Sequence, residues 1–336
     1  MIMKQKPANG SPGGPITGFG PHASGTVVQP QMQSALRNPT HKRMTSALLP
    51  YLFVAPALFM LLLVYGGPTI ATVVLSFSNW DGVSRHFDFV GVRNFTTMLS
   101  DMEARTSLRN TLVFSVVTVV VQNVVALLLA LALNTRLRGR TFFRSVFFMP
   151  STISLVAVAL AWSIIFDPVN GPLPHVLQGL GLGALANVQW LADPNVVLYT
   201  ICFVNIWQWT GWNMVFYLAG LQGIPKDLYE AARIDGASRL AIFRRITLPL
   251  LASTVTINLV FATIGGLKVF ELPFIMTNGG PGFSSQTLTM TILNNFFTNN
   301  QAGYASALSL ILIALTIIIV AVQRRALAGA EERAVA

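Results

Sequence analysis

Residues 224–237 read Ile-Pro-Lys-Asp-Leu-Tyr-Glu-Ala-Ala-Arg-Ile-Asp-Gly-Ala, and residues 246–249 read Ile-Thr-Leu-Pro. Pro225 suits the start of a helix, where a missing amide donor costs nothing. Gly236 is expected to end that helix, because glycine adopts the left-handed conformation of a tight reversal without strain. Ser238 then caps a second short helix, and Pro249 marks the return to the membrane. The stretch predicts a compact helix-turn-helix within residues 222–249.

The first of these two helices carries a narrow apolar stripe. Leu228, Ala231 and Ala232 are spaced i, i+3 and i+4, so their side chains share one face. The small alanine side chains would let the surface of another protein approach closely. An amphipathic loop lying on the bilayer explains the charge pattern, but not the Glu-Ala-Ala, Asp-Gly-Ala and Ile-x-Leu-Pro elements together. We therefore expect a docking surface.

The composition around this loop is that of a membrane protein. Hydrophobic residues make up 53% of the chain and charged residues 10%, which would leave a soluble domain without a solvated surface. Six apolar segments each approach the roughly 20 residues that a bilayer-crossing helix needs. They are residues 48–77, 111–133, 146–166, 196–221, 250–270 and 304–322. The sequence predicts an all-α polytopic membrane protein with six transmembrane helices, the first of them kinked or cut short at Gly66-Gly67-Pro68.

Basic residues indicate the sidedness of the chain. Lys and Arg gather before the first segment, between the second and third, between the fourth and fifth, and after the sixth, whereas residues 167–193 and 271–303 contain none. Because cytoplasmic loops retain Lys and Arg, we expect a multi-pass protein of the cytoplasmic (inner) membrane with both termini in the cytoplasm. The net charge of +10 then reflects sidedness and attraction to anionic lipid headgroups, not nucleic-acid binding.

The chain is expected to form one membrane domain with two tails. Residues 1–46 are rich in Gly, Pro, Ser and Gln and predict a disordered cytoplasmic tail rather than a signal peptide. Residues 47–325 form the transmembrane domain, and residues 326–336 a cytoplasmic C-terminal tail. Cys202, the only cysteine, lies inside the fourth segment, which excludes a disulfide within the chain and a cysteine-based metal cluster.

The loop over residues 222–249 resembles the Glu-Ala-Ala loop of ABC-importer permeases. Its residue pattern is similar to that of the carbohydrate-uptake branch, which includes maltose and glycerol-phosphate permeases. Further stretches are similar to that family, namely residues 139–144, 148–150, 268–271, 277–281 and 303–307. The resemblance covers roughly residues 48–325 and implies a type I ABC-importer permease fold with a cytoplasmic Glu-Ala-Ala coupling helix. One departure is the short loop over residues 81–109, which lacks the large inserted domain of the maltose permease.

The resemblance also implies where the energy comes from. The chain has no Gly-x-x-x-x-Gly-Lys-Ser/Thr loop to hold ATP phosphates, so it is expected not to be an enzyme, and ATP and Mg²⁺ belong to two partner ATP-binding subunits. The other implied partners are a second homologous permease subunit, an extracytoplasmic solute-binding protein and membrane lipid. The residues expected to couple to the ATPase are Glu230, Ala231, Ala232, Asp235, Gly236, Ala237 and Pro249.

A polar and aromatic face of the fourth segment is the candidate solute path. Its members are spaced i, i+3, i+4, i+7 and i+8, and they are Asn205, Gln208, Trp209, Trp212 and Asn213. Amides pair with hydroxyl groups, and an indole can lie against the C–H face of a sugar ring. Hydrogen bonding between membrane helices is the open alternative for the same side chains.

The resemblance adds positions for the solute on a second helix. Maltose-type permeases hold their solute on the helices before and after the loop, which matches Asn205, Gln208, Trp209 and Trp212 on the first of these helices. On the second, the matching positions are Ala262, Gly266 and Val269, which lack polar side chains. Small residues there leave room for a larger solute or permit close helix packing, and both readings stay open. No metal site is predicted.

The leading hypothesis is a permease subunit of an ATP-driven, binding-protein-dependent ABC importer that translocates a sugar, oligosaccharide or related polyol compound. One alternative is a secondary transporter driven by an ion gradient, which would need acidic residues inside its spans, whereas those of this chain lie in loops or near span ends. A non-transporting membrane assembly subunit is the other alternative, and it gives no role to the docking loop.

Overall fold

The chain is described by a computed structural model over residues 51, 53–135 and 138–335. It divides into two units, residues 1–59 and residues 60–336, and the described part of the first unit begins a helix that runs from Phe53 to Leu75. In the described residues there is no β-strand, only an isolated antiparallel bridge between Ser78 and Phe89. The all-α prediction is confirmed for this part of the chain. The predicted tail over residues 1–46 lies outside the described residues.

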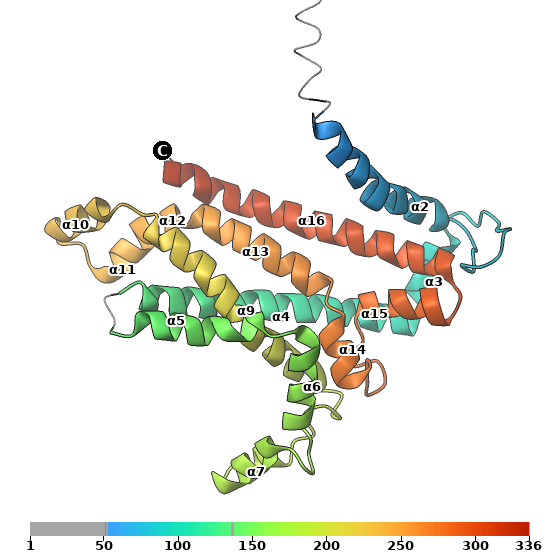
Figure 1. Cartoon of the computed structure of the whole chain (residues 1–336), viewed down its shortest axis with the longest axis horizontal. Coiled ribbons are helices and arrows are strands. Elements are labelled where there is room, and N and C mark those ends of the chain that lie inside the picture. The colour runs from blue at the N-terminus through green and yellow to red at the C-terminus, as the bar shows by residue number, and fades with distance from the viewer. Residues whose placement is uncertain (1–50, 52, 136–137, 336) are drawn as a thin grey trace, which may run out of the picture. The chain divides into compact units, whose positions relative to one another are not determined.

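Four long helices build the bundle of the second unit: α4 (Met102–Leu133), α9 (Val197–Gln222), α13 (Ala252–Leu267) and α16 (Ala302–Val335). Shorter helices precede and connect them: α2 (Gly67–Leu75), α3 (Arg93–Ser100), α5 (Arg140–Phe148), α6 (Leu155–Ile165), α7 (Pro172–Gly179), α8 (Gly183–Ala186), α14 (Glu271–Thr277) and α15 (Leu288–Leu293). Figure 1 shows the segment between α9 and α13 at one end of this bundle, and α14 and α15 toward the other.

The predicted spans correspond to helices of two kinds. Three described helices are long and apolar enough to cross a membrane, and two bent helix pairs raise the number to five. The three are Phe53–Leu75, Met102–Leu133 and Ala302–Gly329, and the pairs are Arg140–Thr152 with Leu155–Ile165 and Arg239–Leu250 with Ala252–Leu267. α9 has 26 residues, about 39 Å at 1.5 Å per residue, but its amide and indole side chains lower its hydropathy.

The third predicted segment, residues 146–166, is not one straight helix. The chain bends by 96° between Arg140–Thr152 and Leu155–Ile165. Pro150 has no amide donor, the turn around it tightens to a 3-10 helix over Met149–Thr152, and Ile153 is extended with ψ 140°. Pro150 therefore lies where the predicted span over residues 146–166 breaks.

Two helices extend beyond their predicted limits. α4 begins at Met102 rather than near residue 111, because Oδ1 of Asp101 accepts hydrogen bonds from the amides of Glu103 at 2.9 Å and Ala104 at 3.3 Å. Glu103 therefore lies on a helix rather than in the predicted loop over residues 81–109. α16 continues through residues 326–335, so the predicted C-terminal tail begins as helix.

A wider helical turn precedes each of two prolines, Pro68 and Pro249. Before Pro68, residues Leu62–Gly66 form a π-helical turn, and the amide of Gly67 bonds to the carbonyl of Leu62. The helix from Phe53 to Leu75 therefore continues through the Gly66-Gly67-Pro68 sequence where a kink or early exit was predicted. The same turn precedes Pro249, where the amide of Leu248 bonds to the carbonyl of Phe243. In each π-turn the backbone hydrogen bond runs to the fifth residue back instead of the fourth. The wider turn accommodates the position where proline has no amide donor.

α4 and α9 form the most extensive helix pair, and α13 packs on both. Inside this contact, the hydroxyl of Tyr217 donates to Oδ1 of Asn123 at 2.7 Å. The amide nitrogen of Asn258 on α13 donates to the backbone carbonyl of Asn213 at 3.1 Å. Buried polar pairs of this kind fix the register of packed helices, because any slide leaves a polar group unpaired.

The end of the bundle away from the α9–α13 connection is also tied by polar contacts. The amide nitrogen of Asn110 on α4 donates to the carbonyls of Phe283 at 2.8 Å and Gln286 at 3.0 Å. In return, Nε2 of Gln286 donates to Oε1 of Glu103 at 2.5 Å. The connection between α14 and α15 is thus held on the first turns of α4.

We predict that Gly211→Ala destabilises the bundle. A Cβ atom at Gly211 would overlap the carbonyl of Phe147 and lie 2.8 Å from the Cα of Phe148. Relieving such overpacking typically costs about 1–3 kcal/mol. Thermal unfolding of the purified protein in detergent measures the loss. The matched control is Gly265→Ala, where no atom lies within 4 Å of the new methyl group. A Gly211→Ala protein as stable as the control would contradict a close contact between Gly211 on α9 and the backbone of Phe147 and Phe148.

Candidate coupling surface and solute path

The segment between α9 and α13 begins with helix α10 (Lys226–Ile234). Pro225 caps it in an extended conformation with ψ 133°, Asp227 lies in its first turn and Arg233 in its last. Negative charge at the amino end and positive charge at the carboxyl end both favour the helix dipole. The helix start predicted from Pro225 is confirmed.

Gly236 reverses the chain after α10. Its φ is +75°, and no atom lies within 4 Å of a Cβ placed there, so glycine is needed for its backbone conformation and not for space. The amide of Ala237 bonds to the carbonyl of Ala232 at 2.9 Å, and the amide of Gly236 to that of Arg233 at 3.1 Å. These two bonds form a Schellman motif, which confirms the predicted helix end.

A second, bent helical segment returns the chain to the bundle. Ser238 caps α11 (Arg239–Ile242), its Oγ accepting from the amide of Ala241 at 3.3 Å, as predicted. A π-turn over Phe243–Thr247 and the short α12 (Leu248–Leu250) follow, and Pro249 lies within α12. The chain then bends by 66° into α13.

Two contacts attach α10 to the bundle. Ile224, just before the helix, is buried in the cluster formed by α4, α9 and α13 side chains, and Tyr229 packs against the same cluster. The Tyr229 and Thr247 hydroxyl oxygens lie 3.3 Å apart, a hydrogen bond between the two halves of the helix-turn-helix. Sequence reasoning missed Tyr229. The only available signal was an aromatic residue beside the Leu228–Ala232 stripe.

The rest of α10 is open. No residue of α10 is buried, and Leu228 is 42% exposed. Of the predicted coupling residues, four are exposed and three are half-buried. The exposed ones are Glu230, Ala231, Asp235 and Gly236, and the half-buried ones are Ala232, Ala237 and Pro249. An exposed helix that carries both an apolar stripe and a carboxylate suits contact with another protein.

The structure divides the predicted solute-path residues of α9 between several contacts. Gln208 is 1% exposed, and its Nε2 donates to the carbonyl of Ile153 at 3.2 Å, at the break before α6. Asn213 is buried where α13 contacts α9. Oε1 of Gln208 and Nδ2 of Asn213 have no protein partner. Gln208 thus joins α9 to the break before α6 through its side chain, whereas Asn213 contributes only its backbone carbonyl to the contact with α13. Each side chain keeps one buried polar atom without a partner.

The other candidate residues are more accessible. Asn205 and Trp209 are half-buried. Trp212 is 45% exposed, and its ring stacks on Phe148 with centroids 6.0 Å apart. Gly266 on α13 faces α4 instead, because a Cβ there would lie 3.0 Å from Oγ of Ser115 and 3.1 Å from its Cα. Close helix packing accounts for Gly266 in this structure.

Sequence reasoning missed the buried contact of Tyr217 with Asn123. The two residues are 94 positions apart in the chain, so no local pattern links them. In the described part of the chain, no group of three or more His, Cys, Asp or Glu side chains could hold a metal ion. Cys202 is buried among apolar side chains of the core.

Several apolar spans, joined by an exposed helix-turn-helix, define a multi-pass membrane protein. Residues 122–327 match the family described as "Binding-protein-dependent transport system inner membrane component". The match covers more than half of the chain, and the chain belongs to this family. It is therefore a permease component and not an enzyme, and the resemblance to carbohydrate-uptake ABC permeases is confirmed.

Individual relatives are similar over most of their length. YurN of Bacillus subtilis, a probable ABC transporter permease protein, is 36% identical, with 80% of this chain and 92% of the relative covered. UgpA of Agrobacterium fabrum, an sn-glycerol-3-phosphate transport system permease protein, is 34% identical, with 83% and 94% covered. MalF of Thermococcus litoralis, a trehalose/maltose transport system permease protein, is 33% identical, with 81% and 90% covered.

Solved structures share the fold. A chain of a bacterial ABC transporter involved in the import of the acidic polysaccharide alginate has a TM-score of 0.74 and 24% identity, with 86% of this chain and 98% of that chain covered. A bacterial alginate ABC transporter in complex with alginate pentasaccharide-bound periplasmic protein also gives 0.74 at 24% identity, with 84% and 95% covered. The type I importer permease fold is thus confirmed.

We predict that Gly236→Ala loosens the end of α10. An alanine in the left-handed conformation costs about 1–2 kcal/mol, and the Schellman bonds depend on that conformation. Hydrogen exchange of the Ala237 amide should become roughly 5- to 30-fold faster, the factor that this cost corresponds to. Gly236→Asn is the control, since asparagine tolerates this conformation, and its exchange should stay closer to that of the unmodified protein. Equal exchange in both variants would contradict the assignment.

Proposed function

We propose that this chain is the substrate-translocating permease subunit of an ATP-driven, binding-protein-dependent importer of a sugar, oligosaccharide or related polyol compound. The observation that carries the proposal is the exposed α10, with its apolar stripe and carboxylate, on a chain of the binding-protein-dependent family. The substrate class is supported by relatives named for sn-glycerol-3-phosphate, for trehalose and maltose, and for multiple sugar-binding transport.

The proposed energy source lies outside the chain. ATP and Mg²⁺ would be bound by two partner ATP-binding subunits, one of which would dock on α10 through Leu228, Ala231 and Glu230. Closure of the ATPase pair would move α10 as a rigid body, because the Schellman bonds close its carboxyl end and Ile224 anchors the chain just before its amino end. Ile224 would pass that movement to α9, and the hydrogen bond from Tyr229 to Thr247 would pass it toward α13.

The remaining partners follow from the same proposal. A second homologous permease subunit would complete the membrane pathway, and an extracytoplasmic solute-binding protein would deliver the solute. The alginate transporter solved with its periplasmic protein supports such a delivery partner. In this proposal α10 and both termini lie in the cytoplasm, because loops rich in Lys and Arg favour that side of the membrane.

The proposed solute path runs along α9. Asn205 and Trp209 are half-buried and Trp212 is exposed, so they could be reached by a solute. The atoms without a protein partner on Gln208 and Asn213 favour a hydroxyl-rich ligand or water when the helices separate, because a buried polar group without a partner is costly. Gly266 belongs to this path only if α13 moves away from Ser115.

We predict that Ala231→Trp prevents docking of the ATP-binding subunits. The indole would stand on the exposed stripe where a partner helix or cleft must approach closely, while nothing buried in the bundle is disturbed. Co-purification of the tagged chain with its coexpressed permease and ATPase partners measures the effect, and recovery of the ATPase should fall at least tenfold. Ala184→Trp, an exposed alanine on α8, is the matched control and should retain the ATPase. Undiminished ATPase recovery with Ala231→Trp would refute this docking surface.

We predict that Trp212→Ala weakens solute handling without uncoupling the ATPase. Loss of one aromatic contact of about 0.5–1.5 kcal/mol should raise the solute concentration for half-maximal uptake about two- to tenfold. Uptake into proteoliposomes that contain the complete complex and the binding protein measures it. Trp207→Ala is the matched control, because Trp207 packs on Trp162, away from the proposed path. An equal loss in both variants would mean that Trp212 serves only packing.

The alternative of an ion-gradient transporter is tested in the same vesicles. Our proposal expects that the vesicles accumulate no solute unless ATP is supplied on the side that carries the ATP-binding subunits. A proton or sodium gradient should not replace ATP. Accumulation driven by a gradient through this chain alone would favour the alternative. Normal uptake after deletion of the chain would favour an assembly subunit without a transport role.

A further inference from the structure

A groove of about 740 Å³ lies between α13 and α16, near the end of the bundle that carries α10. Its α13 wall runs from Ser253 at one end past Ile257 and Val260 to Phe261, and Arg324 and Arg325 come from α16. The described residues that line it include no acidic side chain. Arg324 reaches across at the level of Thr256 and Val260, and the wall beyond it, toward Phe261 and Ala321, is apolar. The groove contains none of the residues assigned to the solute path or the coupling surface.

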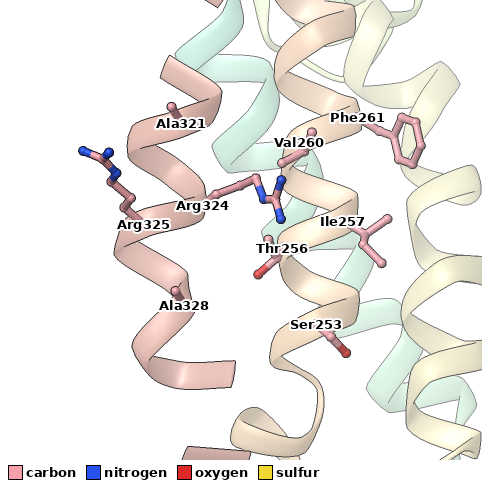
Figure 2. A pocket seen from close by; sticks show the side chains of 9 residues that line it. All are labelled: Ser253, Thr256, Ile257, Val260, Phe261, Ala321, Arg324, Arg325 and Ala328. Atoms are coloured by element: carbon pink, nitrogen blue, oxygen red, sulfur yellow. The ribbon is translucent and has the colours of Figure 1, made fainter. Parts of the chain in front are cut away.

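The basic end has one well-placed donor. Figure 2 shows Arg324 extending from α16 across the groove toward α13, whereas Arg325 points to the opposite side of α16. The hydroxyl of Thr256 donates to the carbonyl of Ala252 at 3.0 Å, so its proton is committed within α13. Arg324 is therefore the donor that an anion would meet in the groove, with Arg325 adding positive charge nearby.

The depth of Arg324 matches a lipid headgroup. Counted from Ala302, Arg324 lies about 33 Å along α16 at 1.5 Å per residue, and a bilayer's hydrocarbon core is about 30 Å thick. The apolar end of the groove then lies inside the hydrocarbon. The two helices are held together there, because Nε2 of Gln323 donates to Oγ1 of Thr263 at 2.8 Å.

We propose that the α13–α16 groove binds one anionic phospholipid, with its phosphate on Arg324 and an acyl chain along Val260 and Phe261. A guanidinium group matches phosphate in charge and geometry, and basic pockets between membrane helices favour anionic headgroups. A free phosphate would leave the apolar half of the groove exposed, and an uncharged lipid would leave the arginine unpaired. The proposal does not depend on the transported solute.

The test uses the complete complex in nanodiscs of phosphatidylcholine with a minority of phosphatidylglycerol. Native mass spectrometry of the complex counts the phosphatidylglycerol that stays bound. Arg324→Gln should lower its retention roughly fivefold, the effect of one arginine near an anionic headgroup. Arg105→Gln, which removes an exposed arginine near the start of α4, is the matched control and should retain phosphatidylglycerol as the unmodified complex does.

A second pair of variants separates the groove from general surface charge. Val260→Trp fills the apolar half while keeping both arginines, and it should also lower retention. Ile317→Trp, at an exposed position of α16 outside the lining, should not. Unchanged retention in both Arg324→Gln and Val260→Trp would overturn the proposal. A disulfide between Val260→Cys and a cysteine introduced into the second permease would also overturn the proposal, because a helix of that subunit would then fill the groove.

Discussion

The contact between α4 and α9 is the constraint on which the rest of the bundle depends. Gly211 lets α9 approach the backbone of α5, and the bond from Tyr217 to Asn123 fixes the register of α9 on α4. α13 packs against both helices, and α16 packs on α13. A shift of α9 along its axis would strand two buried polar groups in an apolar surrounding, which costs several kcal/mol. The helices around α9 are therefore positioned by its register.

Within a membrane, every backbone polar group needs a partner, and this requirement explains the irregular parts of the chain. Pro68 and Pro249 have no amide donor for the hydrogen bonds of their helices, and a π-turn before each proline accommodates this loss. At Pro150 the helix breaks instead, and the carbonyl of Ile153 is satisfied by Gln208 from another helix. One polar side chain of α9 thus stabilises a bend in the third span, which links the architecture of the bundle to the same helix face that we propose for the solute.

Local sequence patterns predict the helix-turn-helix well, because its limits depend on residues with one strong conformational preference each. Pro225, Gly236 and Ser238 lie where those preferences place them. The break at Ile153 could not be predicted, because a proline near a span start and a proline at a break look alike in sequence. The cap at Asp101 was visible but lay among other polar residues. Contacts such as that of Gly266 with Ser115 depend on how distant helices meet.

The proposed coupling requires a path that is stiff where force enters and able to bend further in. α10 meets the first requirement, since the Schellman bonds close its carboxyl end and Tyr229 and Ile224 hold it to the bundle. The second is met by the 66° bend before α13, where a π-turn and Pro249 leave the ladder of hydrogen bonds less regular than in a straight helix. Movement of α10 would therefore concentrate its angular change at Leu251, next to the contact of Asn258 with α9, and separate the helices where Gln208 and Asn213 keep atoms without partners.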